Sequence, residues 1–290
     1  MKRYILITSL IFLNITIALS QISQKNIEQI IENKKATIGV AIIYQDKVYT
    51  IGNNNKYPLM SAFKFHIALT ALKKMEKENI ALDSMVCISK EKMHENTYSP
   101  LRDKYPDQDI HIPYKEIIKY TVSISDNNTC DFLIDFVGGI ENVNSYIRSL
   151  GIDDFNFSET EDDMHRDIMN SYNNWSTPLS MTQLIRKIYT ENILSCEYFK
   201  FLEQTMLETS SGVDKLRAGL PENIKFGHKT GHSDRRPDGV QIGEADSGVI
   251  YLPNGKKCYI TVFIKDSKES DKDNARIMAD IAKAVFQSLI

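Results

Sequence analysis

The sequence predicts an α+β protein in which both ends of the chain supply strands to one antiparallel sheet and the middle of the chain is helical. Runs rich in β-branched and aromatic residues lie near the two ends, whereas apolar residues recur at helical spacing through the middle and again over residues 273–290. We therefore expect an α/β part, residues 21–56 and 210–290, with helices flanking the sheet. An all-helical part, residues 57–209, is inserted into it, and a binding site is expected in the cleft between the parts.

Residues 1–20 have the composition of an export signal. Two basic residues precede an apolar run over residues 4–19, and small residues at positions 18 and 20 mark a cleavage site before Gln21. The run is short for a transmembrane anchor, which is the alternative interpretation. We therefore expect a protein that is periplasmic or secreted, with no stable membrane association after cleavage.

The charge balance argues against two classes of partner. The formal net charge is −3, and it becomes −5 when Lys2 and Arg3 leave with the signal. No basic run is long enough to attract nucleic acid or an anionic membrane. The remaining chain of about 270 residues is long enough to bury a large core, and we expect a monomer.

The four cysteines do not suggest a metal site. Cys87, Cys130, Cys196 and Cys258 form no C-x-x-C pair and no cluster with histidine, so we expect no metal and no other cofactor. Export would allow disulfides, but spacing alone does not assign partners. Cys130 and Cys258 lie within apolar patterns and are expected as buried free thiols.

The strands of the α/β part are expected in two groups. Gln45-Asp46 would join the first two as a hairpin, and Pro253-Asn254-Gly255 would form the turn between the last two. The helix over residues 273–290 should pack on this sheet. The expected strands span residues 38–44, 47–51, 224–228, 246–252 and 257–265.

The helices of the middle part follow from apolar residues at a spacing of three and four. Thr177 before Pro178 is typical of a helix start, and Ser195 suits the cap of the following helix. The expected helices span residues 61–78, 129–136, 140–150, 178–191 and 195–209.

Three short motifs occur in a fixed order, and together they suggest nucleophilic catalysis. They are Ser61-Ala62-Phe63-Lys64, Ser125-Asp126-Asn127 and Lys229-Thr230-Gly231. Each motif is weak by itself, since S-x-x-K also occurs at Ser89–Lys92 and S-x-N at Ser171–Asn173. The order, the spacing and the apolar surroundings of the first motif carry the prediction.

The first motif places a hydroxyl and an amine one helical turn apart. Ser61 would lie at a helix N-terminus, where free N–H groups favour negative charge, and Lys64 would lie on the same face. A partly desolvated amine there can act as a base toward the hydroxyl. The alternative is a capping serine and a solvated lysine on an ordinary helix.

The other two motifs supply groups that hold a substrate. Ser125 is a candidate proton relay to a leaving nitrogen, and Asn127 offers an amide to a substrate amide; the alternative is an N-cap for the next helix. Lys229 supplies a positive charge, and Thr230 can bind a carboxylate. Gly231 permits close approach of a ligand backbone, although the same stretch could be an edge strand running into a turn.

After residues 1–20, the chain resembles class A serine β-lactamases over nearly its whole length, and the branch of the PER and CfxA cephalosporinases most of all. The resemblance rests on Tyr57–Leu72, Thr97–Pro100, Ser125-Asp126-Asn127 and residues 227–231. It implies a serine β-lactamase and penicillin-binding-protein type of fold.

The resemblance also implies roles for individual residues. Ser61 would be acylated by the lactam and activated by Lys64, and Ser125 would relay a proton. Lys229 and Thr230 would bind the substrate carboxylate. Tyr98 would flank the cleft, while the backbone N–H groups of Ser61 and His232 would form the oxyanion hole.

A hydrolytic base separates a β-lactamase from a peptidoglycan peptidase. The family carries it in a loop of the pattern E-x-x-L-N, which here corresponds to Glu161-Asp162-Asp163-Met164-His165. We expect Glu161 to orient the hydrolytic water, with Glu159 as the rival in another register and a solvated acidic loop as the structural alternative. His165 replaces the usual asparagine, an exchange that the PER-like branch shares.

A second departure concerns the carboxylate of the substrate. Many relatives have an arginine on the strand after Lys229-Thr230-Gly231, where Ser247 is the aligned residue here. Lys215 is expected to supply that charge, with Arg235 and Arg236 as nearby alternatives. A lysine is a point charge and lacks the bidentate fork of arginine.

The expected function is hydrolysis of the β-lactam ring, a cyclic amide, of penicillins and cephalosporins, which would confer antibiotic resistance. The reaction would pass through an acyl-enzyme on Ser61 and a water activated by Glu161. One alternative is a D,D-peptidase or penicillin-binding protein that acts on peptidoglycan stem peptides and does not need Glu161. A lactam sensor that stays acylated is another.

Overall fold

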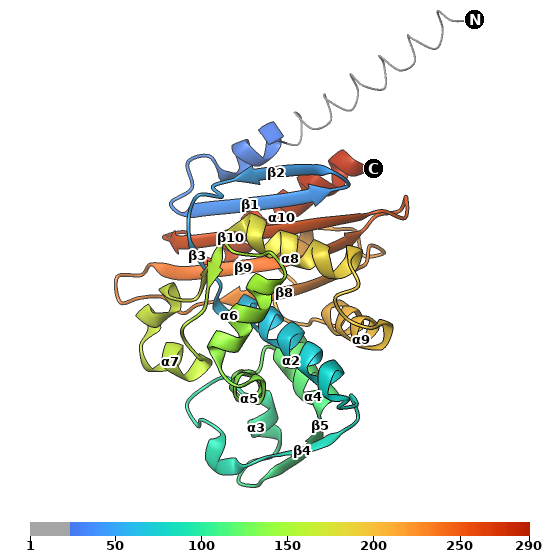
Figure 1. Ribbon diagram of the computed structural model, residues 1–290. Helices are drawn as coiled ribbons and strands as arrows, with labels where there is room; N and C mark the ends of the chain where they lie inside the picture. Colours follow the sequence, from blue (N-terminus) through green and yellow to red (C-terminus); the bar gives the residue numbers. More distant parts are fainter. Residues whose placement is uncertain (1–23) are drawn as a thin grey trace, which may run out of the picture.

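A five-stranded antiparallel sheet, in the order β2-β1-β10-β9-β8, is the centre of the α/β part (Figure 1). The computed structural model describes residues 24–290, so the expected signal and its cleavage site lie outside the described residues. β1 near the N-terminus pairs with β10 near the C-terminus along its whole length, which confirms the predicted α+β class. The strands are β1 (Thr37–Tyr44), β2 (Lys47–Ile51), β8 (Phe226–His232), β9 (Gln241–Tyr251) and β10 (Lys257–Ser267).

Both faces of this sheet are buried, because helices cover each of them (Figure 1). On one face, Ile260 and Val262 of β10 pack with α10 (Asp271–Leu289) and with the helical residues 24–31. On the other face, Tyr259 and Phe263 of the same strand join α8 (Pro178–Thr190) and the core of the helical part. Successive side chains point to opposite faces, so a strand covered on both faces is apolar at nearly every position.

The helical part is built around α2 (Lys64–Glu78), whose first nine residues are all buried. A helix that is buried around its whole circumference needs neighbours on every side. The helical elements of this part besides α2 and α8 are η1 (Met60–Phe63), η2 (Lys90–Lys92), α3 (Pro100–Lys104), α4 (Tyr114–Lys119), η3 (Tyr120–Ile124), α5 (Asn127–Val137), α6 (Ile140–Ser149), α7 (Glu161–Arg166), η4 (Ile168–Tyr172) and α9 (Cys196–Leu207). Neighbours of α2 include η1, η3, α5, α6 and α9. Short strands and η5 complete the chain: β3 (Tyr57–Pro58), β4 (Met85–Ile88), β5 (Ile110–Pro113), β6 (Phe155–Asn156), β7 (Trp175–Ser176) and η5 (Leu216–Gly219).

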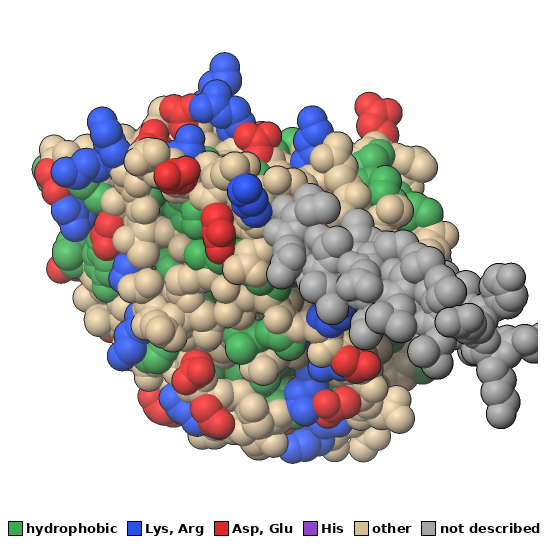
Figure 2. Space-filling view, turned by 90° about the horizontal axis from the view of Figure 1, so that it is seen from above, with side chains coloured by type: hydrophobic (Ala, Val, Ile, Leu, Met, Phe, Trp, Pro, Cys, Tyr) green, Lys and Arg blue, Asp and Glu red, His purple; other side chains and the backbone are tan. Residues whose placement is uncertain are grey.

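Basic and acidic side chains alternate over the face seen from above, with no large patch of one sign (Figure 2). This surface fits a protein of small net charge. Within residues 24–290, no helix has both the length and the apolarity that a membrane crossing requires.

Two strands are longer than their apolar patterns predicted. β8 continues through Lys229 to His232, and β9 begins at Gln241 instead of residue 246. The extra length pairs buried polar residues, such as Lys229 opposite Ser247. The third motif therefore lies in the second half of the edge strand β8, one residue before the strand ends.

Two helix starts also differ from the prediction. Ser61 lies in the 3₁₀ turn η1 that precedes α2, one turn before the α-helix itself. The helix expected from Thr129 begins at Asn127, and its N-cap is Asp126, whose carboxylate accepts the Thr129 N–H at 2.9 Å. Ser125 is thereby left outside the helix, in a left-handed conformation with φ of 71°.

The sequence also makes predictions for two cysteines and for two helix caps. Cys130 and Cys258 are buried free thiols, as expected. Thr177 caps α8, since its hydroxyl accepts the Ser180 N–H at 3.2 Å. Ser195 occupies the N-cap of α9 without a side-chain hydrogen bond to it.

A glycine in η5 is expected to be essential for stability. A Cβ atom on Gly219 would lie 1.9 Å from the Ala279 carbonyl oxygen of α10, which is backbone and cannot rotate away. We predict that Gly219→Ala lowers the free energy of unfolding by about 2–3 kcal/mol through overpacking, measured by denaturant titration. Gly227→Ala is the matched control, because its Cβ would meet nothing closer than Met206 Cβ at 3.4 Å. Equal stability of the two variants would contradict the prediction.

Candidate active site

Ser61 is held against strand β8 by a close backbone approach. Met60 adopts a left-handed conformation with φ of 47°, which turns the chain from β3 into η1. A Cβ atom on Gly231 would lie 2.3 Å from the Leu59 carbonyl oxygen and 2.9 Å from the Ala62 amide nitrogen. Gly231 is thus needed for the strand to lie beside the serine, a role toward the protein's own backbone and not only toward a ligand.

The Lys64 ammonium is the centre of the site. It is fully buried, and its Nζ lies 3.0 Å from Ser61 Oγ, 2.7 Å from the Ser125 carbonyl oxygen and 2.5 Å from Asn127 Oδ1. It also forms an ion pair with Glu161, at 3.0 Å from Oε1. This contact is not aligned as a hydrogen bond, so the attraction is Coulombic. The burial predicted for Lys64 is thus observed, and the alternative of a solvated lysine is excluded.

The Ser125 hydroxyl lies between two ammonium groups. Lys229 Nζ donates to Ser125 Oγ at 2.9 Å, and Lys64 Nζ approaches it at 3.4 Å. Burial, followed by the positive charge of Lys64, holds the pKa of Lys229 well below its ordinary value. With both neighbours acting as donors, the hydroxyl proton of Ser125 is free to point toward the cleft.

Glu161 and its rival Glu159 have different surroundings. Glu161 is the first residue of α7, is only 7% exposed and faces Lys64. Glu159 lies on the surface, where its carboxylate accepts hydrogen bonds from Ser158 and Asn173. Glu161 lines the cleft and Glu159 does not, so the geometry favours Glu161 as the base.

Asp131, which belongs to none of the three motifs, positions Glu161. The Asp131 carboxylate accepts the N–H groups of Glu161 at 2.8 Å and Asp162 at 3.0 Å, and it thereby caps α7 from α5. Burial, with a smaller contribution from the Glu161 charge, raises the pKa of Asp131 to about 7. Its position four residues after Asn127, on the same helix face, was a usable signal.

Lys215 and His232 share one buried carboxylate, that of Glu244. Lys215 Nζ lies 2.8 Å from Glu244 Oε1, and His232 Nδ1 lies 2.9 Å from Oε2, where Gln241 Nε2 also donates at 2.6 Å. Burial is the largest single effect and opposes the charged form of Lys215. The charge and the hydrogen bond of Glu244, together with the charges of Asp246 and Asp214, outweigh burial and raise the lysine pKa. The hydrogen bond to Glu244 likewise raises the pKa of His232. Glu244 was missed because no motif contains it.

Lys215 alone among the candidate cations lines the cleft. Arg235 pairs with Asp271, and Arg236 pairs with Asp238, both outside the cleft. Ser247 is buried opposite Lys229, with its hydroxyl lacking a hydrogen-bond partner, and it does not reach the cleft either.

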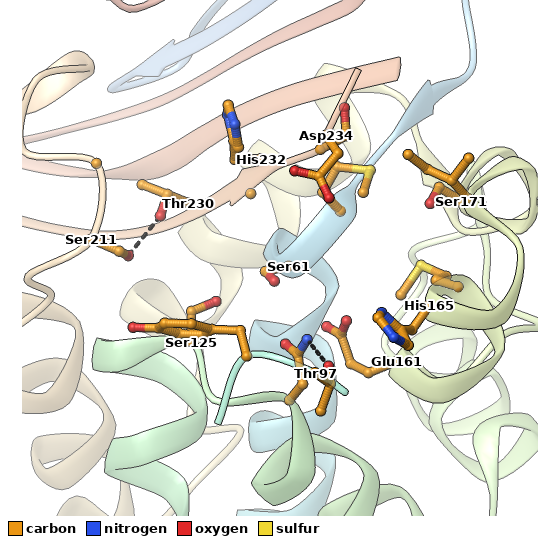
Figure 3. Close-up of a pocket in the computed structure, with 18 of the residues that line it drawn as sticks. Ser61, Thr97, Ser125, Glu161, His165, Ser171, Ser211, Thr230, His232 and Asp234 are labelled. Carbon is orange, nitrogen blue, oxygen red and sulfur yellow. Dashed lines mark hydrogen bonds between the residues drawn. The ribbon is translucent and has the colours of Figure 1, made fainter. Parts of the chain in front are cut away.

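These groups surround a cleft of about 670 Å³ (Figure 3). Ser61 lies at its centre, with Thr230 and Ser211 on one side and His165 and Ser171 on the other. The predicted residues that line it are Ser61, Tyr98, Ser125, Asn127, Glu161, His165, Lys215, Thr230, Gly231 and His232. The two remaining predicted residues, Lys64 and Lys229, are buried and reach Ser61 and Ser125 through their ammonium groups.

Two lining residues that the sequence analysis left out hold predicted ones in place. Thr97 Oγ1 accepts from Asn127 Nδ2 at 2.7 Å, which leaves Asn127 Oδ1 for Lys64. Ser211 and Thr230 share a hydrogen bond of 2.7 Å between their hydroxyls. Tyr98 stands at the rim with 58% of its surface exposed.

Residues 24–290 contain no group of three or more His, Cys, Asp or Glu side chains arranged to hold a metal ion.

Comparisons with known proteins agree with this geometry. Residues 22–289 match the model of the β-lactamase enzyme family. The chain belongs to that family. A β-lactamase of Bacteroides uniformis is 46% identical over 92% of this chain and 90% of its own length. The extended-spectrum β-lactamase PER-1 of Pseudomonas aeruginosa is 33% identical over 94% of this chain and 89% of its own.

Solved structures place this β-lactamase in class A. A class A β-lactamase of Bacteroides cellulosilyticus superposes with a TM-score of 0.91 and 47% identity, over 93% of this chain and 98% of that one. The predicted resemblance to class A enzymes, PER-1 among them, is confirmed. Hydrolysis of β-lactams is accordingly the activity of the family to which the chain belongs.

The Asp131 cap should make stability depend on pH. An acid whose pKa is raised on folding, here from 3.8 to about 7, binds its proton more tightly in the folded state, so ionisation costs stability. We predict that wild type loses stability relative to Asp131→Asn as the pH rises from about 4 to about 7, measured by denaturant titrations across that range. A stability difference that stays constant with pH would contradict this assignment.

The Glu244 carboxylate, which Lys215 and His232 share, should control the titration of His232. We predict that Glu244→Gln lowers the pKa of His232, because it replaces the acceptor that stabilises the imidazolium by a neutral amide. Histidine NMR signals followed over pH measure the effect. Glu222→Gln, on the exposed surface, is the control and should leave the His232 titration unchanged.

Proposed function

We propose that this β-lactamase opens β-lactam rings through an acyl-enzyme on Ser61, which a water activated by Glu161 then hydrolyses. The observation that carries the proposal is that one buried Lys64 Nζ lies 3.0 Å from both Ser61 Oγ and Glu161 Oε1. A nucleophile, its base and a second base are thus within proton-transfer reach of one another.

In acylation, Lys64 passes a proton to Glu161 and accepts the hydroxyl proton of Ser61. The serine oxygen bonds to the lactam carbonyl carbon while the backbone N–H groups of Ser61 and His232 stabilise the oxyanion. The carbon–nitrogen bond of the ring then breaks, and the leaving nitrogen takes the Ser125 proton. Lys229 donates a hydrogen bond to Ser125 Oγ at 2.9 Å and supports that transfer. Lys64, whose Nζ lies 3.4 Å from Ser125 Oγ, returns a proton to Ser125, and Glu161 gives its proton back to Lys64.

In deacylation, Glu161 accepts a proton from water as its oxygen attacks the ester carbonyl. The ester bond to Ser61 breaks, and the serine oxygen takes a proton from Lys64. Glu161 then passes to Lys64 the proton that it received from water. Asp131, which caps α7 by accepting the Glu161 N–H, fixes the position of Glu161 for this step. His165, which lines the cleft one turn further along α7, borders the space for the water.

The substrates proposed are penicillins and cephalosporins, held through their carboxylate. Thr230 and Ser211 offer hydroxyls at one end of the cleft, and Lys215 supplies a charge there. The Lys215 charge is balanced by Glu244, so the hydroxyls carry more of the carboxylate recognition than in a site with an unpaired arginine. The relative PER-1 is named an extended-spectrum enzyme, which supports cephalosporins among the substrates.

We also propose that the enzyme is exported, with cleavage before Gln21, and acts as a monomer that confers antibiotic resistance. The composition of residues 1–20 supports the export and the cleavage site. Cell fractionation with mass spectrometry of the mature N-terminus tests export and cleavage. Light scattering of the purified protein tests the monomeric state.

Turnover of a chromogenic cephalosporin tests the mechanism. We predict steady multiple turnover by wild type, no reaction in Ser61→Ala, and a single-turnover burst in Glu161→Ala, with deacylation slower by about 10²–10⁴-fold. Glu159→Ala is the matched control and should turn over like wild type. A stoichiometric burst from wild type itself would overturn the proposal and indicate a D,D-peptidase or penicillin-binding protein.

A further inference from the structure

The loop that carries the proposed hydrolytic base closes on itself. Asn174 Oδ1 accepts the N–H groups of Ser158 at 2.9 Å and Glu159 at 3.0 Å. The Asn174 Nδ2 group donates in turn to the Glu159 carbonyl oxygen at 2.8 Å. Residues 158–174 are therefore tied together at their two ends and form one unit, which contains both α7 and η4.

One side chain of this loop hydrogen-bonds to the α/β part. Within residues 24–290, Tyr172 of η4 is the loop residue that does so: its hydroxyl donates to the Asp266 carboxylate of β10 and accepts from Arg236 Nη1 at 3.4 Å. Burial, followed by the hydrogen bond to Asp266 and its charge, raises the pKa of Tyr172 to about 12. The hydroxyl therefore keeps its proton at neutral pH and remains a donor. We call these three residues the Tyr172 clasp.

The clasp depends on an uncommon backbone conformation of Asp266. Its φ is 52°, in the left-handed region, although the residue lies within β10. Regular alternation would place its side chain with those of Val262 and Ile264, which pack with α10. The left-handed residue breaks this alternation, and its carboxylate reaches Tyr172 on the loop instead. Such conformations cost energy and persist only where the surroundings determine them.

The clasp joins the two walls of the cleft from outside it. Tyr172 directly follows Ser171, which lines the cleft on the side of the loop. Arg236 follows Asp234 by two residues, and Asp234 lines the cleft on the side of β8. Ser171 and Asp234 lie on the same side of Ser61 in the view of Figure 3. The three clasp residues do not line the cleft themselves, so the clasp acts by holding the walls and not by touching substrate.

The two chemical steps depend on this loop to different degrees. In acylation the loop supplies one group, Glu161, which takes a proton from Lys64 across a contact of 3.0 Å. Deacylation needs more, because a water must lie between Glu161 and the ester in a space that His165 also borders. The ester carbonyl is held meanwhile by the His232 N–H on the opposite wall. A misplacement of about 1 Å between such groups can cost about 100-fold in rate.

We propose that the Tyr172 hydroxyl is a positioning group for deacylation, which fixes the loop of Glu161 against the wall that contains the oxyanion hole. The inference rests on the proposed function. A hydrogen bond of ordinary strength corresponds to a factor of about three to ten. Tyr172→Phe keeps the ring and removes the hydroxyl, so it should slow deacylation by about that factor and leave acylation unchanged.

Steady-state constants separate this role from a loss of folded protein. Where deacylation limits turnover, slowing it lowers kcat and KM by the same factor and leaves kcat/KM unchanged, whereas a loss of folded enzyme lowers kcat at constant KM. We predict the first pattern for Tyr172→Phe with a chromogenic cephalosporin. Mass spectrometry of the protein after rapid quenching follows the decay of the acyl group on Ser61 and measures the deacylation rate directly.

Asp266→Gly is the second variant, and it separates the contact from the backbone. Glycine adopts a left-handed conformation without strain, so this change relieves the backbone of β10 while it removes the acceptor of the clasp. Deacylation should slow as in Tyr172→Phe. The double variant should be no slower than either single variant, because both changes remove the same interaction.

Tyr198→Phe is the matched control. It also removes a tyrosine hydroxyl, one that donates to the Ile80 carbonyl oxygen at 2.6 Å beyond the C-terminal end of α2 and away from the cleft. This variant should keep the wild-type kcat and KM.

Deacylation rates that equal the wild-type rate in both clasp variants would overturn the proposal, and so would a fall in kcat at constant KM or an equal change in Tyr198→Phe. Failure of the proposed hydrolysis has a different signature. Wild type would then release one equivalent of product and keep the acyl group on Ser61, which overturns both proposals because no deacylation remains for the clasp to assist.

Discussion

The ammonium group of Lys64 is the contact on which the rest of the site depends. It brings together oxygen atoms from η1, the end of η3, α5 and α7, which are separate segments of the chain. A buried cation is costly unless acceptors surround it, so the lysine and its partners stabilise one another's positions. The same geometry that satisfies the charge aligns a nucleophile with two bases. The same Lys64 nitrogen atom therefore stabilises the fold and takes part in the proposed reaction.

Close backbone packing makes that alignment possible. Gly231 and Gly243 let strands β8 and β9 lie against the turn that carries Ser61, where a Cβ on Gly243 would be 3.0 Å from the Pro58 carbonyl oxygen. The turn itself needs Met60 in a left-handed conformation. Strain of this kind persists only where the surroundings determine it fully, and here the sheet supplies those surroundings.

The sequence predicted the class of the fold and the principal site residues, because motifs place chemistry at local spacing and apolar periodicity marks helices and strands. It predicted strand ends poorly, since buried polar residues such as Lys229 and Ser247 interrupt the apolar pattern. It missed Asp131 and Glu244 for another reason. Each acts on a partner far away in the chain, and one sequence does not show which distant residues meet.

The sheet joins the beginning of the chain to its end, and this has a consequence for synthesis. β1 pairs with β10, more than 200 residues later, and Ser61 depends on β8 for one wall of its cleft. A chain still emerging from the ribosome has neither the partner of its first strand nor the wall beside its nucleophile. Contacts so distant in sequence form late and together. The active site therefore forms only after β8, β9 and β10 have been synthesised.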